Sequence, residues 1–220
     1  MPELDFLVKR VDAVRYAAVP MLNFKLHIAN TTPGNAIAGH DIANVMLQCQ
    51  IQIEAQRRRY QPAELDRLGD LFGDPNHSGQ GPRLLLWTHV SLLVPGFQNS
   101  VVADMPVPCS YDFNVAAVKY FDALEGGEVP LSFQFSGSIF YRDDNADLQI
   151  SRIAWSKEAR FALPVAVWRQ MIDHYYPNIN WLQLERGVFD RLSDYRRQRG
   201  LASCEQALES LLAATGEHVR

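Results

Sequence analysis

Residues Val129–Tyr141 read VPLSFQFSGSIFY and are the most informative stretch of the chain. Its large apolar side chains fall on alternate positions, and serine and glutamine fill most of the positions between them. A strand with one buried face and one face in water, or against a second layer, has this period of two. The stretch therefore predicts a long β-strand.

The same alternation recurs along the chain and is cleanest at Val45–Glu54. Cys49 falls on the apolar side there, so we predict a small buried hydrophobic side chain rather than a reactive thiol. If this strand lies at a sheet edge, it could pair with a second copy of the chain, and the sequence leaves edge or centre open. The other predicted strands are residues 5–11, 22–28, 84–94, 101–107, 111–118, 148–155 and 158–163.

Helices are predicted inside and after this set of strands. Pro62 suits a first helical turn and Gly73 a C-terminal cap, which predicts an inserted helix near 62–72. After Pro164 the apolar period changes from 2 to about 3.6. Helices are predicted there at 165–175, 182–198 and 203–212.

The expected fold class is α+β, a mostly antiparallel β-sheet or sandwich with one inserted helix and C-terminal helices. Residues 1–163 would form the β scaffold. Residues 164–220 would form a C-terminal helical segment packed on it, within one domain.

Composition excludes several classes of function. The chain has 220 residues, 47% of them hydrophobic, a net charge of -4 and three widely spaced cysteines. Such a composition lacks the basic patch of a nucleic-acid binder and the long apolar run of a membrane span. No secretory leader is evident, and the cysteines form no disulfide or metal-binding pattern. We expect a cytoplasmic protein with reduced thiols, no metal and no cofactor.

One arrangement could carry chemistry. Cys109 and Asp112 would lie near His89 if neighbouring strands pair, and a Cys-His-Asp set can activate a thiolate. This predicts, as an alternative, a thiol- or metal-dependent enzyme or metal carrier with an accessible Cys109. A packed thiol explains Cys109 equally simply.

Arginine residues provide the first candidate for a docking surface. Arg57, Arg58 and Arg59 are adjacent and are followed by Tyr60. Three neighbouring cations repel one another unless they are solvated or paired. We predict that these residues, with His77 in the loop 73–82, contact a protein partner.

Several passages resemble an uncharacterised bacterial family, a domain of unknown function. They include LDFLVKRVDAVRYAAVP (4–20), CQIQIEAQRRRY (49–60), LLWTHVSLLVPGF (85–97) and LPVAVWRQMIDHYYPN (163–178). The family is associated with gene neighbourhoods of nickel–iron hydrogenases and their maturation factors. The resemblance implies an accessory role near a hydrogenase, and it implies no catalytic residues.

The leading hypothesis is therefore a non-enzymatic accessory protein that binds another protein, such as a hydrogenase subunit or maturation factor. The enzyme or metal carrier built on Cys109 is one alternative. A binder of a small ligand inside the β scaffold is another, because curved sheets can enclose cavities. The oligomeric state stays open.

Overall fold

The structure is a computed structural model that describes residues 2–31, 41–73, 83–110, 115–143 and 145–214. The chain divides into two compact units, Met1–Asn178 and Ile179–Arg220. We call the first the β unit and the second the helical unit.

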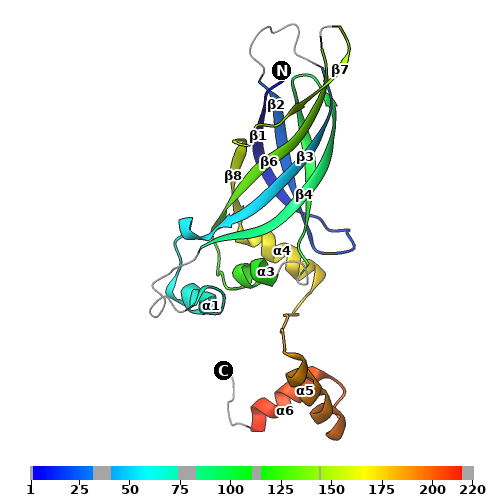
Figure 1. Ribbon diagram of the computed structural model, residues 1–220. Coiled ribbons are helices and arrows are strands. Elements are labelled where there is room, and N and C mark those ends of the chain that lie inside the picture. The colour runs from blue at the N-terminus through cyan, green and yellow to red at the C-terminus, as the bar shows by residue number, and fades with distance from the viewer. Residues whose placement is uncertain (1, 32–40, 74–82, 111–114, 144, 215–220) are drawn as a thin grey trace. The chain divides into compact units, whose positions relative to one another are not determined.

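The β unit contains two antiparallel sheets (Figure 1). The first has the order β1-β2-β5, with β1 at Leu4–Ala13, β2 at Met21–Asn30 and β5 at Ser100–Pro108. The second has the order β4-β3-β6-β7, and β8 also pairs with β6. Its strands are β3 (Asp41–Glu54), β4 (Leu84–Phe97), β6 (Glu128–Arg142), β7 (Leu148–Arg152) and β8 (Glu158–Pro164). The predicted α+β class with mostly antiparallel strands is confirmed.

Strand β3 lies inside the second sheet, between β4 and β6. Its apolar side chains face inward as the alternation predicts, and Cys49 is only 2% exposed. Because both edges of β3 are hydrogen-bonded to neighbouring strands, this strand is not a free edge for a second copy.

Aromatic rings fill the space between the two sheets. Phe6 of β1 stacks on Phe135 of β6 with ring centroids 4.3 Å apart. Phe24 of β2 meets Phe133 of β6 edge-on at 5.3 Å. Stacked and edge-to-face pairs are the arrangements that aromatic quadrupoles favour. These contacts support a packed core, and they give no support to the alternative of a ligand inside the scaffold.

Strands β7 and β8 follow one another along the same edge of β6. Strand β8 pairs with Glu128–Gln134 and β7 with Ser138–Arg142. The chain between them leaves the ladder in a tight turn, in which the Lys157 N–H donates to the Ala154 carbonyl at 3.1 Å. Trp155, predicted as the end of a strand, lies in this turn and is 93% exposed.

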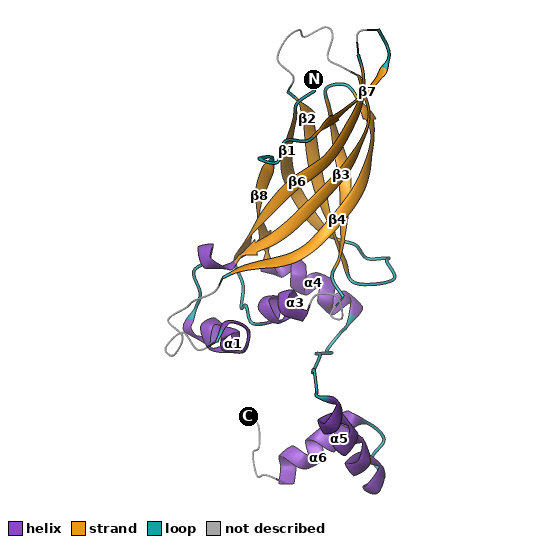
Figure 2. Ribbon diagram, viewed as in Figure 1, coloured by secondary structure: helices purple, strands orange, loops and turns teal. Residues whose placement is uncertain are grey.

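Three helices of the β unit gather at one end of the strands (Figure 2). They are α1 (Pro62–Phe72), α3 (Val115–Asp122) and α4 (Val165–Tyr175). A short 3-10 helix, η1 (Ala55–Arg57), directly follows β3. Helix α1 confirms the predicted inserted helix. Gly73 caps it with a φ of 83°, a conformation that glycine adopts without strain.

The strand predicted at 111–118 is wrong for the part that the structure describes, because Val115–Asp122 form helix α3. Valine and its apolar neighbours suit a strand locally. The helix instead buries Val118, Tyr120 and Phe121, and the Phe121 ring stacks on Trp168 of α4 at 4.2 Å. Tertiary packing overrides the local preference.

The first compact unit ends at Asn178. Helix α4 packs on β1, β2 and β8, so it belongs to the β unit. The predicted division into a β scaffold at 1–163 and a helical segment at 164–220 packed on it stays a prediction.

The helical unit consists of α5 (Arg186–Gln198) and α6 (Cys204–Ala214). The Tyr195 hydroxyl lies 2.9 Å from the Ser210 hydroxyl and links the two helices. The Ser203 hydroxyl accepts the Gln206 N–H at 3.2 Å and so caps the N-terminus of α6. Helix α5 begins at Arg186, later than the predicted start at residue 182.

Candidate functional site

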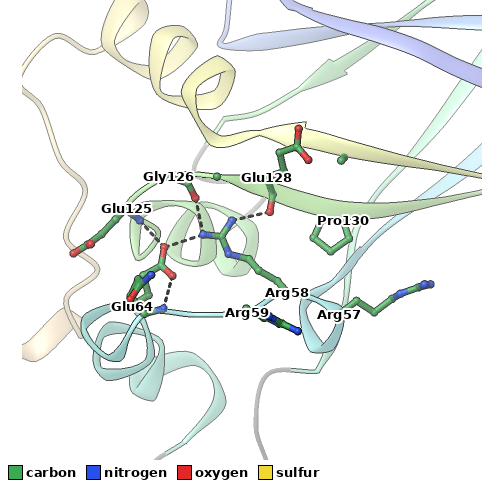
Figure 3. Close-up of a pocket in the computed structure, with 11 residues that line it drawn as sticks. Arg57, Arg58, Arg59, Glu64, Glu125, Gly126, Glu128 and Pro130 are labelled. Atoms are coloured by element: carbon green, nitrogen blue, oxygen red, sulfur yellow. Dashed lines mark hydrogen bonds and ion pairs between the residues drawn. The ribbon is translucent and has the colours of Figure 1, made fainter.

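Three of the predicted docking residues, Arg57, Arg58 and Arg59, line a hollow of about 670 Å³, which we call the arginine pocket (Figure 3). It forms where η1 and the start of α1 meet the segment that leads into β6. Three arginines and three glutamates line it together with small and neutral residues. The charged residues are Arg57, Arg58, Arg59, Glu64, Glu125 and Glu128.

Arg58 is held inside the protein and is only 8% exposed. Its Nη1 donates to the Glu128 carbonyl at 2.7 Å, and its Nη2 donates to the Gly126 carbonyl at 2.6 Å. Nη2 also lies 2.8 Å from Oε1 of Glu64. The guanidinium thereby ties the segment before β6 to helix α1.

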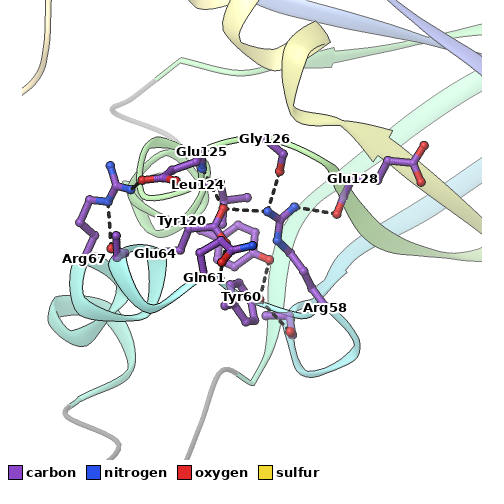
Figure 4. A network of polar contacts seen from close by, with 12 residues as sticks. Arg58, Tyr60, Gln61, Glu64, Arg67, Tyr120, Leu124, Glu125, Gly126 and Glu128 are labelled. Atoms are coloured by element: carbon purple, nitrogen blue, oxygen red, sulfur yellow. Dashed lines mark hydrogen bonds and ion pairs between the residues drawn. The ribbon is translucent and has the colours of Figure 1, made fainter.

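Glu64 is the buried anion of this network (Figure 4). Its Oε2 accepts the Gln61 N–H at 2.9 Å, and its Oε1 accepts the Glu125 N–H at 2.8 Å. Burial alone would raise the pKa of Glu64, but these two donors and Arg58 outweigh it, so the pKa lies below its ordinary value. Glu64 is therefore ionised at neutral pH.

Tyr60 also makes its contacts inside the protein. Its hydroxyl donates to the Ala55 carbonyl at 2.7 Å. Because that bond uses its only proton, the Tyr120 hydroxyl must donate to the Tyr60 oxygen, which lies 2.7 Å away. Burial raises the pKa of both phenols.

These contacts separate the predicted docking residues into two groups. Arg58 and Tyr60 have structural partners that suffice to explain them. Arg57 is 47% exposed and pairs with Glu54 at 3.3 Å, and Arg59 is exposed without an ion pair to any residue that the structure describes. His77 lies outside the described residues. A docking role stays a prediction for all five residues.

The predicted thiol site lacks an accessible thiol. Cys109 is 1% exposed, and its Sγ lies 3.2 Å from the Val107 carbonyl. His89 is exposed on β4 of the second sheet and contacts Oε1 of Gln50 at 3.2 Å, whereas Cys109 follows β5 of the first sheet. Asp112 lies outside the described residues. The structure therefore does not bring Cys109 and His89 together in a solvent-reachable site.

We expect Cys204 to react with a thiol reagent in the folded protein, and Cys49 and Cys109 to react only after unfolding. Burial raises the pKa of both Cys49 and Cys109 to about 12, whereas Cys204 is partly exposed. Because the thiolate is the reactive form, the two buried thiols should be inert near neutral pH. A colorimetric thiol titration with and without guanidinium checks this, and Cys204→Ser should remove the fast phase. Rapid reaction of a second thiol in native protein would show that the core opens at one of these sites.

Within the described residues, no three His, Cys, Asp or Glu side chains lie close enough together to hold a metal ion. Among the helices of the same residues, none is both long and apolar enough to cross a membrane.

The helical unit contains an apolar groove of about 610 Å³ between its two helices and the segment that precedes α5. We call it the C-terminal groove. The apolar residues that line it are Leu182, Leu184, Phe189, Leu192 and Leu208, and Cys204 lies beside them. The helical period predicts Phe189 as an inward residue, but it is 51% exposed. Periodicity identifies an apolar face without showing what covers it.

Comparison with known proteins places the chain in a family without assigning it an activity. No curated protein matches it. Among solved structures, the solution structure of a putative late embryogenesis abundant (LEA) protein is similar at 12% sequence identity, over 74% of this chain and 73% of that chain. Its TM-score of 0.32 is too low to support a functional argument. The model of a family of unknown function (DUF6084) matches residues 1–220, so this chain belongs to that family.

Proposed function

We propose that this chain is a non-enzymatic accessory protein that binds a protein partner through its helical unit. The C-terminal groove carries the proposal, because Phe189 is 51% and Leu182 66% exposed. A unit as short as residues 179–220 rarely buries enough apolar surface to be stable alone, since even domains of about 70 residues are marginal. A partner that covers the groove would supply the missing burial.

The chemistry of the groove indicates what kind of partner fits it. An apolar groove between helices suits the apolar face of an amphipathic helix. Residues 186–199 carry five arginines and two aspartates in a chain whose net charge is -4. Complementary charge guides association and fixes orientation. The partner segment is accordingly an amphipathic helix with acidic residues beside its apolar face.

The family resemblance supports a finer version of this proposal. In it, the partner is a subunit of a nickel–iron hydrogenase or one of its maturation factors, and the two proteins meet in the cytoplasm.

Substitution in the groove tests the proposal. We expect Phe189→Asp to reduce the amount of one co-purifying protein at least tenfold, because a carboxylate in the groove must be desolvated when the partner binds. The full chain is expressed with a tag in its native host, and co-purifying proteins are quantified by mass spectrometry. Val188→Asp is the matched control, since Val188 precedes Phe189 on α5, is 37% exposed and does not line the groove.

Three outcomes distinguish partner binding in general from binding of a hydrogenase subunit or maturation factor. A hydrogenase subunit or maturation factor retained by wild type and Val188→Asp, but lost with Phe189→Asp, supports the finer proposal. An unrelated protein with the same dependence supports partner binding alone. If the amounts of all co-purifying proteins are the same with Phe189→Asp as with wild type, the proposal is contradicted. Recovery of the chain as a lone monomer also contradicts it.

A further inference from the structure

Six polar side chains, none of them Asp, Glu, Lys or Arg, stand together on the outer face of the second sheet. Gln50 and Gln48 project from β3, and each stands directly between a polar residue on β4 and one on β6. The two rows are His89, Gln50 and Gln134, and Ser91, Gln48 and Ser136. We call these six residues the polar grid. From strand geometry it measures roughly 10 Å across the three strands and roughly 7 Å along them.

The polar grid and Trp155 line a hollow of about 520 Å³, together with Cys49, Val90 and Phe135, which are buried. Although 21% of the chain is charged, no Asp, Glu, Lys or Arg of the described residues is among those lining it. The usual outer face of a sheet is solvated by charged side chains as well as neutral ones. A hollow lined by amides, hydroxyls, an imidazole and an exposed indole suits a ligand that is polar and uncharged.

Trp155 is held at the border of this hollow by contacts on both sides of its turn. The Ile153 N–H donates to the Gly137 carbonyl at 3.0 Å, and the Phe135 N–H donates to the Lys157 carbonyl at 2.9 Å. The Lys157 ammonium also pairs with Asp5 at 2.6 Å and with Glu3 at 3.1 Å. The backbone that carries the indole is therefore fixed in advance, which lowers the entropy cost of binding.

We propose that the polar grid and Trp155 form a binding site for a neutral oligosaccharide. A pyranose ring has a face of C–H groups that packs on an indole, whose ring face is electron-rich. Around that face it carries hydroxyl groups that both donate and accept hydrogen bonds, as the glutamine amides and serine hydroxyls do. The size of the grid matches one or two such rings. This site lies in the β unit and does not depend on partner binding by the helical unit.

Other ligand classes fit the site less well. Nucleic acids and anionic polymers need clustered lysines and arginines, and no Lys or Arg of the described residues lines the hollow. A peptide that adds a strand needs a free sheet edge. The hollow is centred on β3, whose two edges are already paired with β4 and β6, and a strand added to β4 at the end of the sheet would lie beside the hollow rather than in it. A ligand here is recognised by side chains alone.

Binding to immobilised oligosaccharides tests the proposal with the full chain. The probes are neutral hexasaccharides of glucose, mannose, galactose and xylose, with sulfated and uronic-acid oligosaccharides as the charged comparison. We expect saturable retention of at least one neutral probe and none of the charged probes. Trp155→Ala should weaken that retention at least tenfold, and it should leave the fold intact because the side chain is 93% exposed.

Two further variants complete the test. Gln50→Thr removes an amide from the centre of the grid while keeping a good strand former, and it should also weaken retention. Trp181→Ala is the control, because it removes an indole that is 44% exposed in the helical unit. It should leave retention on the neutral probes unchanged. Retention of charged probes only, retention of no neutral probe, or unchanged binding by Trp155→Ala would each overturn the proposal.

Discussion

Replacing Glu64 by alanine is expected to lower the free energy of unfolding by about 3–5 kcal/mol, the cost of removing one member of a buried ion pair. The substitution leaves the Arg58 guanidinium, which is 8% exposed, without its counter-ion. It also leaves the backbone N–H groups of Gln61 and Glu125 without their acceptor. Urea denaturation followed by tryptophan fluorescence measures the loss.

The control for this prediction is the neighbouring exposed ion pair. Glu125 pairs with Arg67 at 2.6 Å, but both side chains are about half exposed. Glu125→Ala should therefore cost no more than about 1 kcal/mol. If Glu64→Ala cost as little as Glu125→Ala, the buried network of Arg58 would not exist in solution.

The same network makes a prediction about pH. The pKa of Glu64 is lower in the folded protein than in the unfolded chain. Its contribution to stability is therefore fully present above the ordinary glutamate pKa of about 4.3 and is lost as the pH falls through the folded value. Wild type should lose more stability than Glu64→Gln over this acidic range, and equal losses would contradict the assigned pKa direction.

Gly137→Ala is expected to lower the free energy of unfolding by about 3 kcal/mol or more. Gly137 has a φ of 136°, and a side chain in such a conformation costs about 1–3 kcal/mol. In addition, a Cβ atom at this position would lie 2.0 Å from the Met46 carbonyl oxygen, so strands β3 and β6 would have to move apart. Chemical denaturation monitored by circular dichroism measures the effect.

Gly69→Ala is the matched control for Gly137→Ala. Gly69 lies inside α1, and a Cβ atom there would meet nothing within 4 Å. Alanine in a helix interior is favoured over glycine by about 1 kcal/mol, so this variant should be as stable as wild type or more stable. A Gly137→Ala protein as stable as Gly69→Ala would mean that β3 and β6 do not approach each other as described.

Local sequence patterns predict strands β3 and β6 and helix α1, because the residues that determine these elements lie within or beside them. The alternation in β3 and β6 is visible because each strand has one face in the aromatic core. Helix α1 is visible because Pro62 and Gly73 mark its two ends. Helix α3 was missed because its valines suit a strand, and its helical conformation depends on packing against Trp168, far away in the chain.

The candidate sites were harder to predict because they depend on pairings between distant segments. Arg58 reads as a surface cation, but the carbonyl oxygens that bind it belong to residues 126 and 128. The alternating glutamines of β3 can be recognised from the sequence alone. Their alignment with His89, Gln134 and the turn at Trp155 depends on strand register and on the break between β7 and β8, which no local pattern encodes.

Site-specific photo-crosslinking at position 189 tests whether the C-terminal groove binds a partner protein. A photoreactive phenylalanine analogue replaces Phe189 in the full chain, and the protein is irradiated in its native host before purification and mass spectrometry. We expect adducts that join position 189 to an acidic amphipathic helix of one other protein. Adducts confined to residues 1–178 of the same chain would show that the β unit covers the C-terminal groove. That result would contradict partner binding through the groove.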